Sequence, residues 1–160
     1  MREILIIRGV TMETNPHNLK LEDHLCFSLY ACSRAILRLY RPYLDELQLT
    51  YPQYLVLVTL WEKPQRTIKE LGEVLNLDTG TLTPLLKRME AAGLIERRRD
   101  TVDERVMNIF ITQAGKALQE KASCVPQSLF DATGMNKKEL DEINETIMRL
   151  LHQLNGTAEK

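Results

Sequence analysis

The spacing of the apolar residues changes between residues 66 and 112, and this change limits the folds open to the chain. The segments RTIKELGEVLNL and DTGTLTPLLKRMEAAGLI carry apolar residues at helical spacing. The next two, LIERRR and RVMNIFIT, have the composition of β-strands and are separated by the polar DTVDE. A short helix, a tight turn, a second helix and a hairpin, in this order, predict a winged helix-turn-helix.

The second of these helices has the features of a DNA-recognition helix. Asp78 or Thr79 can cap its start, and Gly93 follows its end. Such a helix enters a major groove with its N-terminal residues, while the hairpin reaches the neighbouring minor groove. Small polar residues also occur at the start of any capped helix, so by themselves they are weak evidence for DNA binding. The order of two helices followed by a basic hairpin is the more specific signal. The candidate DNA contacts on this helix are Thr79, Gly80, Thr81, Thr83 and Pro84 at its start, and Lys87 and Arg88 two turns along.

Helices are predicted on both sides of this motif. One begins near Glu22 with Asp23 as its cap, Pro42 could begin a further helical segment, and Thr50 caps another helix with Pro52 in its first turn. In the last segment apolar residues alternate at steps of three and four, which is a heptad seam that lacks a partner in so short a chain. The seam consists of Leu140, Ile143, Ile147, Leu150 and Leu154. It predicts a homodimer.

Four regions follow from these patterns. They are an N-terminal extension at 1–20 that could be partly disordered, dimerisation helices at 21–62, a DNA-binding region at 63–113, and C-terminal dimerisation helices at 114–160. The fold class is mainly α with a small β wing. Met12 is an alternative translation start to Met1.

Charge and cysteine content exclude several classes of protein. The net charge is −1, and residues 63–112 hold nine Lys or Arg against eight Asp or Glu, which does not favour a general polyanion binder. The basic residues cluster only locally, at 87–88 and 97–99. Three cysteines without CxxC predict neither a disulfide framework nor a zinc site.

The apolar run at 4–7 is too short for a signal peptide or a membrane span. We expect a cytoplasmic protein with no metal and no cofactor.

Three stretches of the sequence resemble a known family. LCFSLYACSR, LTYPQYLVLVTLWE and IKELGEVLNLDTGTLTPLLKRMEAAGLIERRRDTVDERVMNIFIT are similar to the MarR-type repressors of the organic hydroperoxide resistance branch, known as OhrR. The similarity extends over residues 21–133. It implies a homodimeric repressor, not an enzyme, whose N- and C-terminal helices form the dimerisation region. Such a repressor binds an inverted-repeat operator in double-stranded DNA and releases it when an organic hydroperoxide oxidises a cysteine.

The resemblance assigns roles to individual residues. The redox-sensing cysteine falls on Cys26, and the tyrosines that hydrogen-bond its thiolate fall on Tyr40 and Tyr51. In the wing, Arg105 enters the minor groove and Asp103 orients it. Fourteen residues of straight helix separate Cys26 from Tyr40 by about 21 Å, so we assume that the site forms between two subunits. The apolar neighbours Leu25, Phe27 and Leu29 favour an alkyl hydroperoxide over hydrogen peroxide.

The other two cysteines have different interpretations. Cys32 is six residues from Cys26, about 9 Å along a helix, which is beyond disulfide reach and favours a buried packing role. Cys124 lies in the region that supplies a resolving cysteine in some of these repressors, whereas others use a low-molecular-weight thiol. A surface position next to Pro126 explains Cys124 equally well.

Two other functions remain open. A thiol peroxidase using Cys26 is chemically conceivable, although His17, His24 and His152 are too scattered to form a metal site or a Cys–His pair. The closer alternative is a MarR-type repressor released by a bound phenolic small molecule. Release of DNA by peroxide or by a salicylate-like compound separates the two repressors.

Overall fold

The computed structural model describes the backbone at residues 3–7, 10–14 and 20–158. Two compact units are present, Met1–Arg38 and Leu39–Lys160, and each is described by itself. The first begins with an antiparallel hairpin of β1 (Glu3–Ile7) and β2 (Val10–Thr14). The lack of sustained periodicity in residues 1–20 does not predict this hairpin.

The long helix α1 (Leu25–Glu46) begins later than the sequence predicts. Residues Leu21–Asp23 form a separate 3₁₀ turn, so Asp23 is not the cap of α1. His24 has an extended backbone, and its carbonyl accepts the first helical N–H groups instead. Pro42 does not begin a new segment, because α1 continues through it. The loss of one N–H is outweighed by the packing of Tyr40 and Leu44, which are both buried beside it.

The helix α2 (Tyr51–Glu62) begins where the sequence predicts. Thr50 precedes it with an extended backbone, and the Thr50 N–H donates to Gln53 Oε1 at 2.8 Å, which is half of a capping box. Val56, Leu57 and Leu60 are fully buried and form the centre of the core. Each such side chain contributes about 1.5–3 kcal/mol through burial.

The predicted helix-turn-helix consists of α3 (Ile68–Leu75) and α4 (Thr79–Ala91). Asn76 adopts a left-handed backbone, φ 52°, between the two helices, and Gly93 with φ 71° ends the turn after α4. The spacing of Ile68, Leu71, Val74 and Leu75 predicts one buried face of α3. Leu71 packs into the core, but Val74 is 53% exposed and does not share that face. The short α3 therefore offers fewer residues to the core than its sequence suggests.

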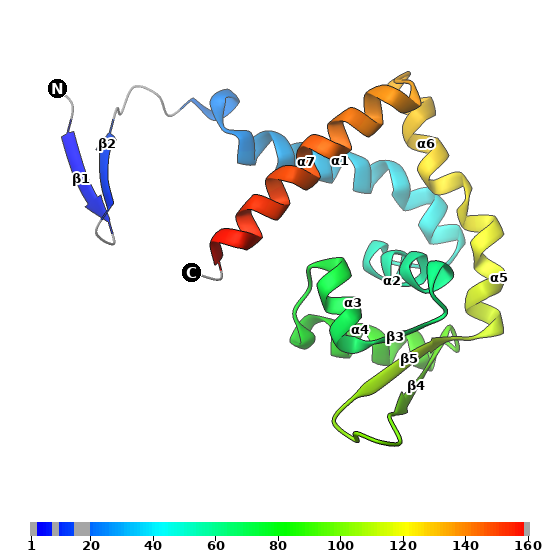
Figure 1. Ribbon diagram of the computed structural model, residues 1–160. Coiled ribbons are helices and arrows are strands. Elements are labelled where there is room, and N and C mark those ends of the chain that lie inside the picture. The colour runs from blue at the N-terminus through cyan, green and yellow to red at the C-terminus, as the bar shows by residue number, and fades with distance from the viewer. Residues whose placement is uncertain (1–2, 8–9, 15–19, 159–160) are drawn as a thin grey trace. The chain divides into compact units, whose positions relative to one another are not determined.

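The wing is part of a three-stranded antiparallel sheet. It contains β3 (Gln65–Thr67), β4 (Ile95–Arg99) and β5 (Met107–Ile111), in the order β3-β5-β4. Figure 1 shows the sheet next to α3 and α4, with the β4–β5 loop extending away from them. The β4–β5 hairpin is predicted and β3 is not. The predicted winged helix-turn-helix is confirmed.

Three helices complete the chain: α5 (Gln113–Ala122), α6 (Cys124–Thr133) and α7 (Lys137–Ala158). The Trp61 indole donates to Gly115 O at 3.0 Å and ties α2 to α5. The predicted seam lies on α7, where Ile143 and Ile147 are exposed. Among the described residues, no helix has both the length and the apolar character that crossing a membrane requires.

The start of α3 yields a prediction about pH. Thr67 N–H donates to Glu70 Oε2 at 2.6 Å and Lys63 Nζ lies 2.9 Å from Glu70 Oε1, and these bonds lower the pKa of Glu70 from 4.5 to about 2. Because the folded pKa is the lower one, Glu70 stabilises the fold above pH 4.5, and this is lost as the pH falls towards 2. We expect Glu70→Gln to lower the unfolding free energy at pH 7 by up to about 1 kcal/mol. The gap to the parent should close on acidification.

Urea unfolding of both proteins from pH 7 to pH 2.5 checks this expectation. Thr67→Val is the matched control, since it removes the hydroxyl that accepts from Glu70 N–H at 3.1 Å and leaves the titrating group in place. It should destabilise the fold by about 1 kcal/mol and depend less on pH than Glu70→Gln, because the Thr67 N–H and Lys63 still lower the pKa of Glu70. A gap between parent and Glu70→Gln that stays constant down to pH 2.5 contradicts the assignment.

Candidate functional site

The N-terminus of α4 is fixed by Asp78. Its Oδ1 accepts the Thr81 N–H at 2.9 Å, and its Oδ2 accepts the Thr81 hydroxyl at 2.7 Å. The hydroxyl bond is the largest cause of a lowered Asp78 pKa. The carboxylate therefore stays charged at the positive end of the helix dipole and stabilises the first turn.

One face of α4 is buried and the other is exposed. Leu82, Leu86 and Met89 point into the core. Thr83 is half-buried, and its hydroxyl donates to Thr79 O at 2.7 Å. The other residues predicted to contact DNA are exposed: Thr79, Gly80, Thr81, Pro84, Lys87 and Arg88. Because the opposite face of α4 packs into the core, almost all of the residues predicted to contact DNA are exposed to solvent.

The arginines of β4 are engaged within the protein. Arg97 Nε lies 2.9 Å from Glu90 Oε2, and Arg98 pairs with Glu96 and stacks over Phe110. Arg99 Nη1 donates to Glu104 O at 2.9 Å. The cluster of three arginines that stands out in the sequence is therefore committed mainly to the wing itself.

Three other cations are exposed and make no ion pair among the described residues: Lys87, Arg88 and Arg105. Asp103 does not hold the Arg105 guanidinium in this structure. Its Oδ1 accepts the Arg105 backbone N–H at 3.0 Å, so it fixes the backbone and leaves the side chain free. Arg105 is thus available to an external anion.

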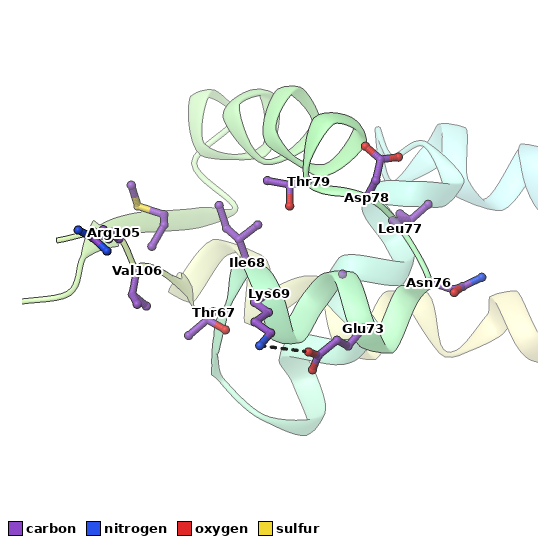
Figure 2. A pocket seen from close by; sticks show the side chains of 12 residues that line it. Thr67, Ile68, Lys69, Glu73, Asn76, Leu77, Asp78, Thr79, Arg105 and Val106 are labelled. Carbon is purple, nitrogen blue, oxygen red and sulfur yellow. Dashed lines mark ion pairs between the residues drawn. The ribbon is translucent and has the colours of Figure 1, made fainter. Parts of the chain in front are cut away.

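A groove of about 910 Å³ connects α3, the start of α4 and the base of the wing. Figure 2 shows Thr79 and Arg105 on its wall, two predicted DNA contacts from distant parts of the sequence. Lys69, in the first turn of α3, also lines the groove, 3.9 Å from Glu73. Lys69 is not among the DNA contacts predicted from the sequence. A cation in the first turn of the first helix of a helix-turn-helix is the signal that could have indicated it. The groove is lined by Thr67, Ile68, Lys69, Gly72, Glu73, Asn76, Leu77, Asp78, Thr79, Arg105, Val106 and Met107.

Cys26 is the second residue of α1 and is exposed. Its neighbours Leu25 and Phe27 are also exposed, 58% and 40% respectively, so apolar surface surrounds the thiol. Cys32 is exposed as well, so the predicted buried packing role is wrong for the chain by itself. A helical cysteine is often buried, but among the described residues of its unit no side chain covers Cys32 enough to bury it.

The tyrosines predicted to bind the thiolate lie together in the second unit. The rings of Tyr40 and Tyr51 are 6.1 Å apart, Tyr54 lies 6.2 Å from Tyr51, and Trp61 lies 6.2 Å from Tyr54. Burial raises the pKa of Tyr40 and Tyr51, with Tyr51 adding to the effect on Tyr40. Both phenols therefore remain protonated at neutral pH.

Both of these hydroxyls are available as donors. Within the part of the chain that the structure describes, neither hydroxyl has a hydrogen-bond partner. Every buried side-chain oxygen and nitrogen in that part does have a partner, so the Tyr40 and Tyr51 hydroxyls are not fully buried. Two protonated and accessible donors side by side suit an anionic acceptor.

Cys124 interacts electrostatically with Tyr54 of this cluster. It is the first residue of α6, it is exposed, and its thiol donates to Lys121 O at 3.1 Å. The pKa of Tyr54 is raised first by burial and then by nearby groups, among them Cys124. Over the described residues, no cluster of three His, Cys, Asp or Glu side chains could hold a metal ion.

Residues 49–107 match the model of the MarR family. The chain is 46% identical over 147 residues to the organic hydroperoxide resistance transcriptional regulator of Bacillus subtilis strain 168, which covers 90% of this chain and 100% of that protein. It is also 44% identical to the HTH-type transcriptional regulator TtmR of Methylorubrum extorquens strain PA1, over 86% of this chain and 71% of that one.

Solved structures of AbfR, a Staphylococcus epidermidis protein, are also similar. Reduced AbfR bound to DNA has a TM-score of 0.74 and 34% identity, and the match covers 89% of this chain and 98% of that one. Disulfide-formed AbfR has a TM-score of 0.58 and 35% identity, with 90% and 96% covered. The predicted family is confirmed. With such identity over nearly its whole length, the chain belongs to the MarR family of transcriptional regulators, which are not enzymes.

Proposed function

We propose that the protein is a homodimeric, redox-sensing repressor that binds an inverted-repeat operator and releases it when an organic hydroperoxide oxidises Cys26. One observation carries this proposal. A chain 46% identical, along 90% of its length, to an organic hydroperoxide resistance regulator has an exposed cysteine in the first turn of α1.

Operator binding uses α4 and the wing. The exposed face of α4 enters the major groove, and Arg105 enters the adjacent minor groove. Lys87 and Arg88 meet phosphates, and Lys69 extends the contact along the groove between α3 and the wing. The structure of a relative, reduced AbfR bound to DNA, supports DNA binding by this fold.

The homodimer covers apolar surface that the single chain exposes. On α1 this surface includes Phe27 and Tyr30, and on α7 it includes Ile143, Ile147 and Met148. Several large apolar side chains exposed on one helix are typical of interfaces. A two-fold dimer places two α4 helices on half-sites about one helical turn apart, which requires an inverted repeat.

The reactive form of Cys26 is its thiolate. Its place at the start of α1 offers the positive end of the helix dipole, and the hydroxyls of Tyr40 and Tyr51 from the partner subunit donate hydrogen bonds to the sulfur. Because the raised pKa of both phenols keeps them protonated, they can donate to the sulfur throughout the neutral pH range. Exposed Leu25 and Phe27 favour an alkyl group on the peroxide.

Sensing is a two-electron oxidation. The Cys26 thiolate attacks the terminal oxygen of the hydroperoxide, an S–O bond forms and the O–O bond breaks. The alkoxide leaves and takes a proton to become an alcohol, and Cys26 becomes a sulfenic acid. A second thiol then attacks the sulfenic sulfur and displaces water to form a disulfide.

The second thiol is Cys124 of the partner subunit or a small cellular thiol. Cys124 interacts electrostatically with Tyr54, whose ring lies 6.2 Å from that of Tyr51, so the tyrosines that bind the thiolate would also bring Cys124 near it. The disulfide-formed structure of AbfR provides a precedent in a relative. Intact mass after treatment with an alkyl hydroperoxide distinguishes a crosslinked dimer from a mixed disulfide.

Release follows because oxidised Cys26 no longer accepts the tyrosine hydrogen bonds. The added oxygen or attached thiol crowds the dimer interface and changes the spacing of the two α4 helices. This coupling requires that the oxidised arrangement binds the operator less tightly than the reduced one.

The test begins with selection of an operator from a random duplex pool by the reduced protein. Fluorescence anisotropy then follows the bound operator during titration with cumene hydroperoxide or with salicylate. We expect an inverted repeat that is released by the hydroperoxide and not by salicylate. Release by salicylate alone contradicts the proposal and indicates a repressor controlled by a phenolic ligand.

The wing contact has its own expected result. Arg105→Ala should weaken operator binding by roughly 1–3 kcal/mol and reduce the salt dependence, because one cation no longer displaces counterions. The measurement is the operator Kd from 50 to 200 mM salt. Lys87→Ala is the comparison, and it should weaken specific and non-specific DNA alike. A loss of affinity in Arg105→Ala with an unchanged salt slope contradicts the contact.

A further inference from the structure

The β4–β5 loop contains three acids, although the proposed function places it against DNA. They are Asp100, Asp103 and Glu104. Carboxylates next to phosphates lower affinity through repulsion. The structure shows that these three acids are not equivalent.

Asp100 organises the loop with both of its carboxylate oxygens. Oδ1 accepts the backbone N–H groups of Val102 at 2.9 Å and Asp103 at 3.1 Å, and Oδ2 accepts Asn108 Nδ2 at 3.0 Å. These bonds, of which the Val102 bond contributes most, hold the pKa of Asp100 below its usual value. The carboxylate is therefore charged at neutral pH and its charge is directed into the loop.

The Asn108 bond ties the loop to the sheet. Asn108 lies on the central strand β5 and is 8% exposed. Its Oδ1 accepts Gln65 Nε2 at 3.4 Å from the neighbouring strand β3. The position of the Asp100 carboxylate is thus set by a buried residue on the central strand of the sheet.

From Asp100 the bonds continue to Arg105. The Asp103 N–H donates to Asp100 Oδ1. Asp103 Oδ1 in turn accepts the Arg105 N–H at 3.0 Å. The loop closes where Asp100 N–H donates to Val106 O at 2.9 Å and Val106 N–H donates to Asp103 O at 2.9 Å. The backbone at Arg105 is therefore held by a chain of bonds that starts at Asp100, while its guanidinium stays exposed.

Glu104 provides the contrast within the same loop. It is exposed, and among the described residues its carboxylate makes no hydrogen bond or ion pair. Only its backbone carbonyl is used, as the acceptor for Arg99. Asp100 and Glu104 thus lie in the same loop, but of these two carboxylates only that of Asp100 is connected by hydrogen bonds, through Asp103, to Arg105.

We propose that Asp100 is a positioning residue that holds Arg105 in the orientation in which it enters the minor groove. This inference rests on the proposed function, because it requires that the wing contacts the operator. Asp100→Ala and Glu104→Ala each remove one carboxylate from the loop. If only charge mattered, both would strengthen operator binding, whereas a positioning role predicts that Asp100→Ala weakens it.

The experiment compares Asp100→Ala, Asp100→Asn and Glu104→Ala in the full chain. Asp100→Ala should weaken operator binding by about tenfold, within the range for losing an arginine contact, and reduce the salt dependence as Arg105→Ala does. Glu104→Ala should leave binding equal or tighter. Asp100→Asn keeps an oxygen for the two N–H groups and should restore most of the affinity. Amide exchange of Val102 and Asp103 should become faster in Asp100→Ala, because their acceptor is lost. Thermal unfolding confirms that the rest of the fold is intact.

Combining Asp100→Ala with Arg105→Ala isolates the coupling. The double variant should bind no more weakly than Arg105→Ala, because an arginine that is absent cannot be misplaced. Additive losses, or equal strengthening by Asp100→Ala and Glu104→Ala, overturn the proposal while the wing contact stands. If Arg105→Ala itself changes neither affinity nor salt slope, the proposed wing contact fails, and the positioning role fails with it.

Discussion

Cys26→Ser is expected to bind the operator as tightly as the parent and to stay bound at hydroperoxide concentrations that release the parent. Serine keeps the size and the hydrogen-bonding group of cysteine, but its hydroxyl does not ionise to a nucleophile at neutral pH. Cys26 is exposed at the start of α1, so the substitution leaves the core unchanged. We expect release to require at least ~100-fold more peroxide, because the thiolate is the reacting form.

Cys32→Ser is the matched control, since it alters an equally exposed thiol on the same helix. It should respond like the parent. Tyr40→Phe and Tyr51→Phe should slow sensing, because each lost hydrogen bond to a charged group is worth about 1.5–3 kcal/mol. If Cys26→Ser releases the operator at the parent's peroxide dose in an anisotropy titration, the sensor lies elsewhere.

Ile147→Glu is expected to convert the protein to a monomer and to lower operator affinity by roughly 100-fold or more, the equivalent of about 3 kcal/mol. Ile147 is 40% exposed on the apolar face of α7. In a two-fold dimer every substitution occurs twice, so two carboxylates would lose water in one interface. Sedimentation at micromolar concentration measures the assembly, and anisotropy measures the affinity.

His152→Glu introduces the same group on the same helix and serves as the control. Nine residues of helix turn it away from Ile143 by about half a turn, so it lies off the apolar face. It should remain dimeric and bind the operator. A parent that sediments as a stable monomer, or an Ile147→Glu variant that stays dimeric, contradicts the proposed interface.

Local signals in the sequence were sufficient to predict the helix-turn-helix and the wing. Asp78 caps α4 and Gly93 follows it because capping and left-handed backbone depend on residue type at a single position. The strand β3 has no such signal. Gln65–Thr67 is extended because it pairs with β5, more than forty residues further along the chain, and no local pattern encodes that pairing.

In the candidate site, too, local patterns in the sequence predict some features and not others. The exposed face of α4 follows from the spacing of Leu82, Leu86 and Met89. Sequence alone does not separate Arg97, which is paired with Glu90, from Arg105, which is free to meet DNA. That distinction depends on side chains that only the fold brings together. Cys26 was found by resemblance, because a single helical cysteine has no pattern that marks it as reactive.

The role of Cys26 as the sensor is tested most directly by following operator release and the chemical state of Cys26 in the same sample. The reduced protein bound to labelled operator is treated with cumene hydroperoxide, anisotropy records release, and peptide mass records the modification of each cysteine over time. If Cys26 is the sensor, release follows the loss of the Cys26 thiol, while Cys32 remains reduced. Release while Cys26 is still a thiol, or complete oxidation of Cys26 and Cys124 with the operator still bound, contradicts it.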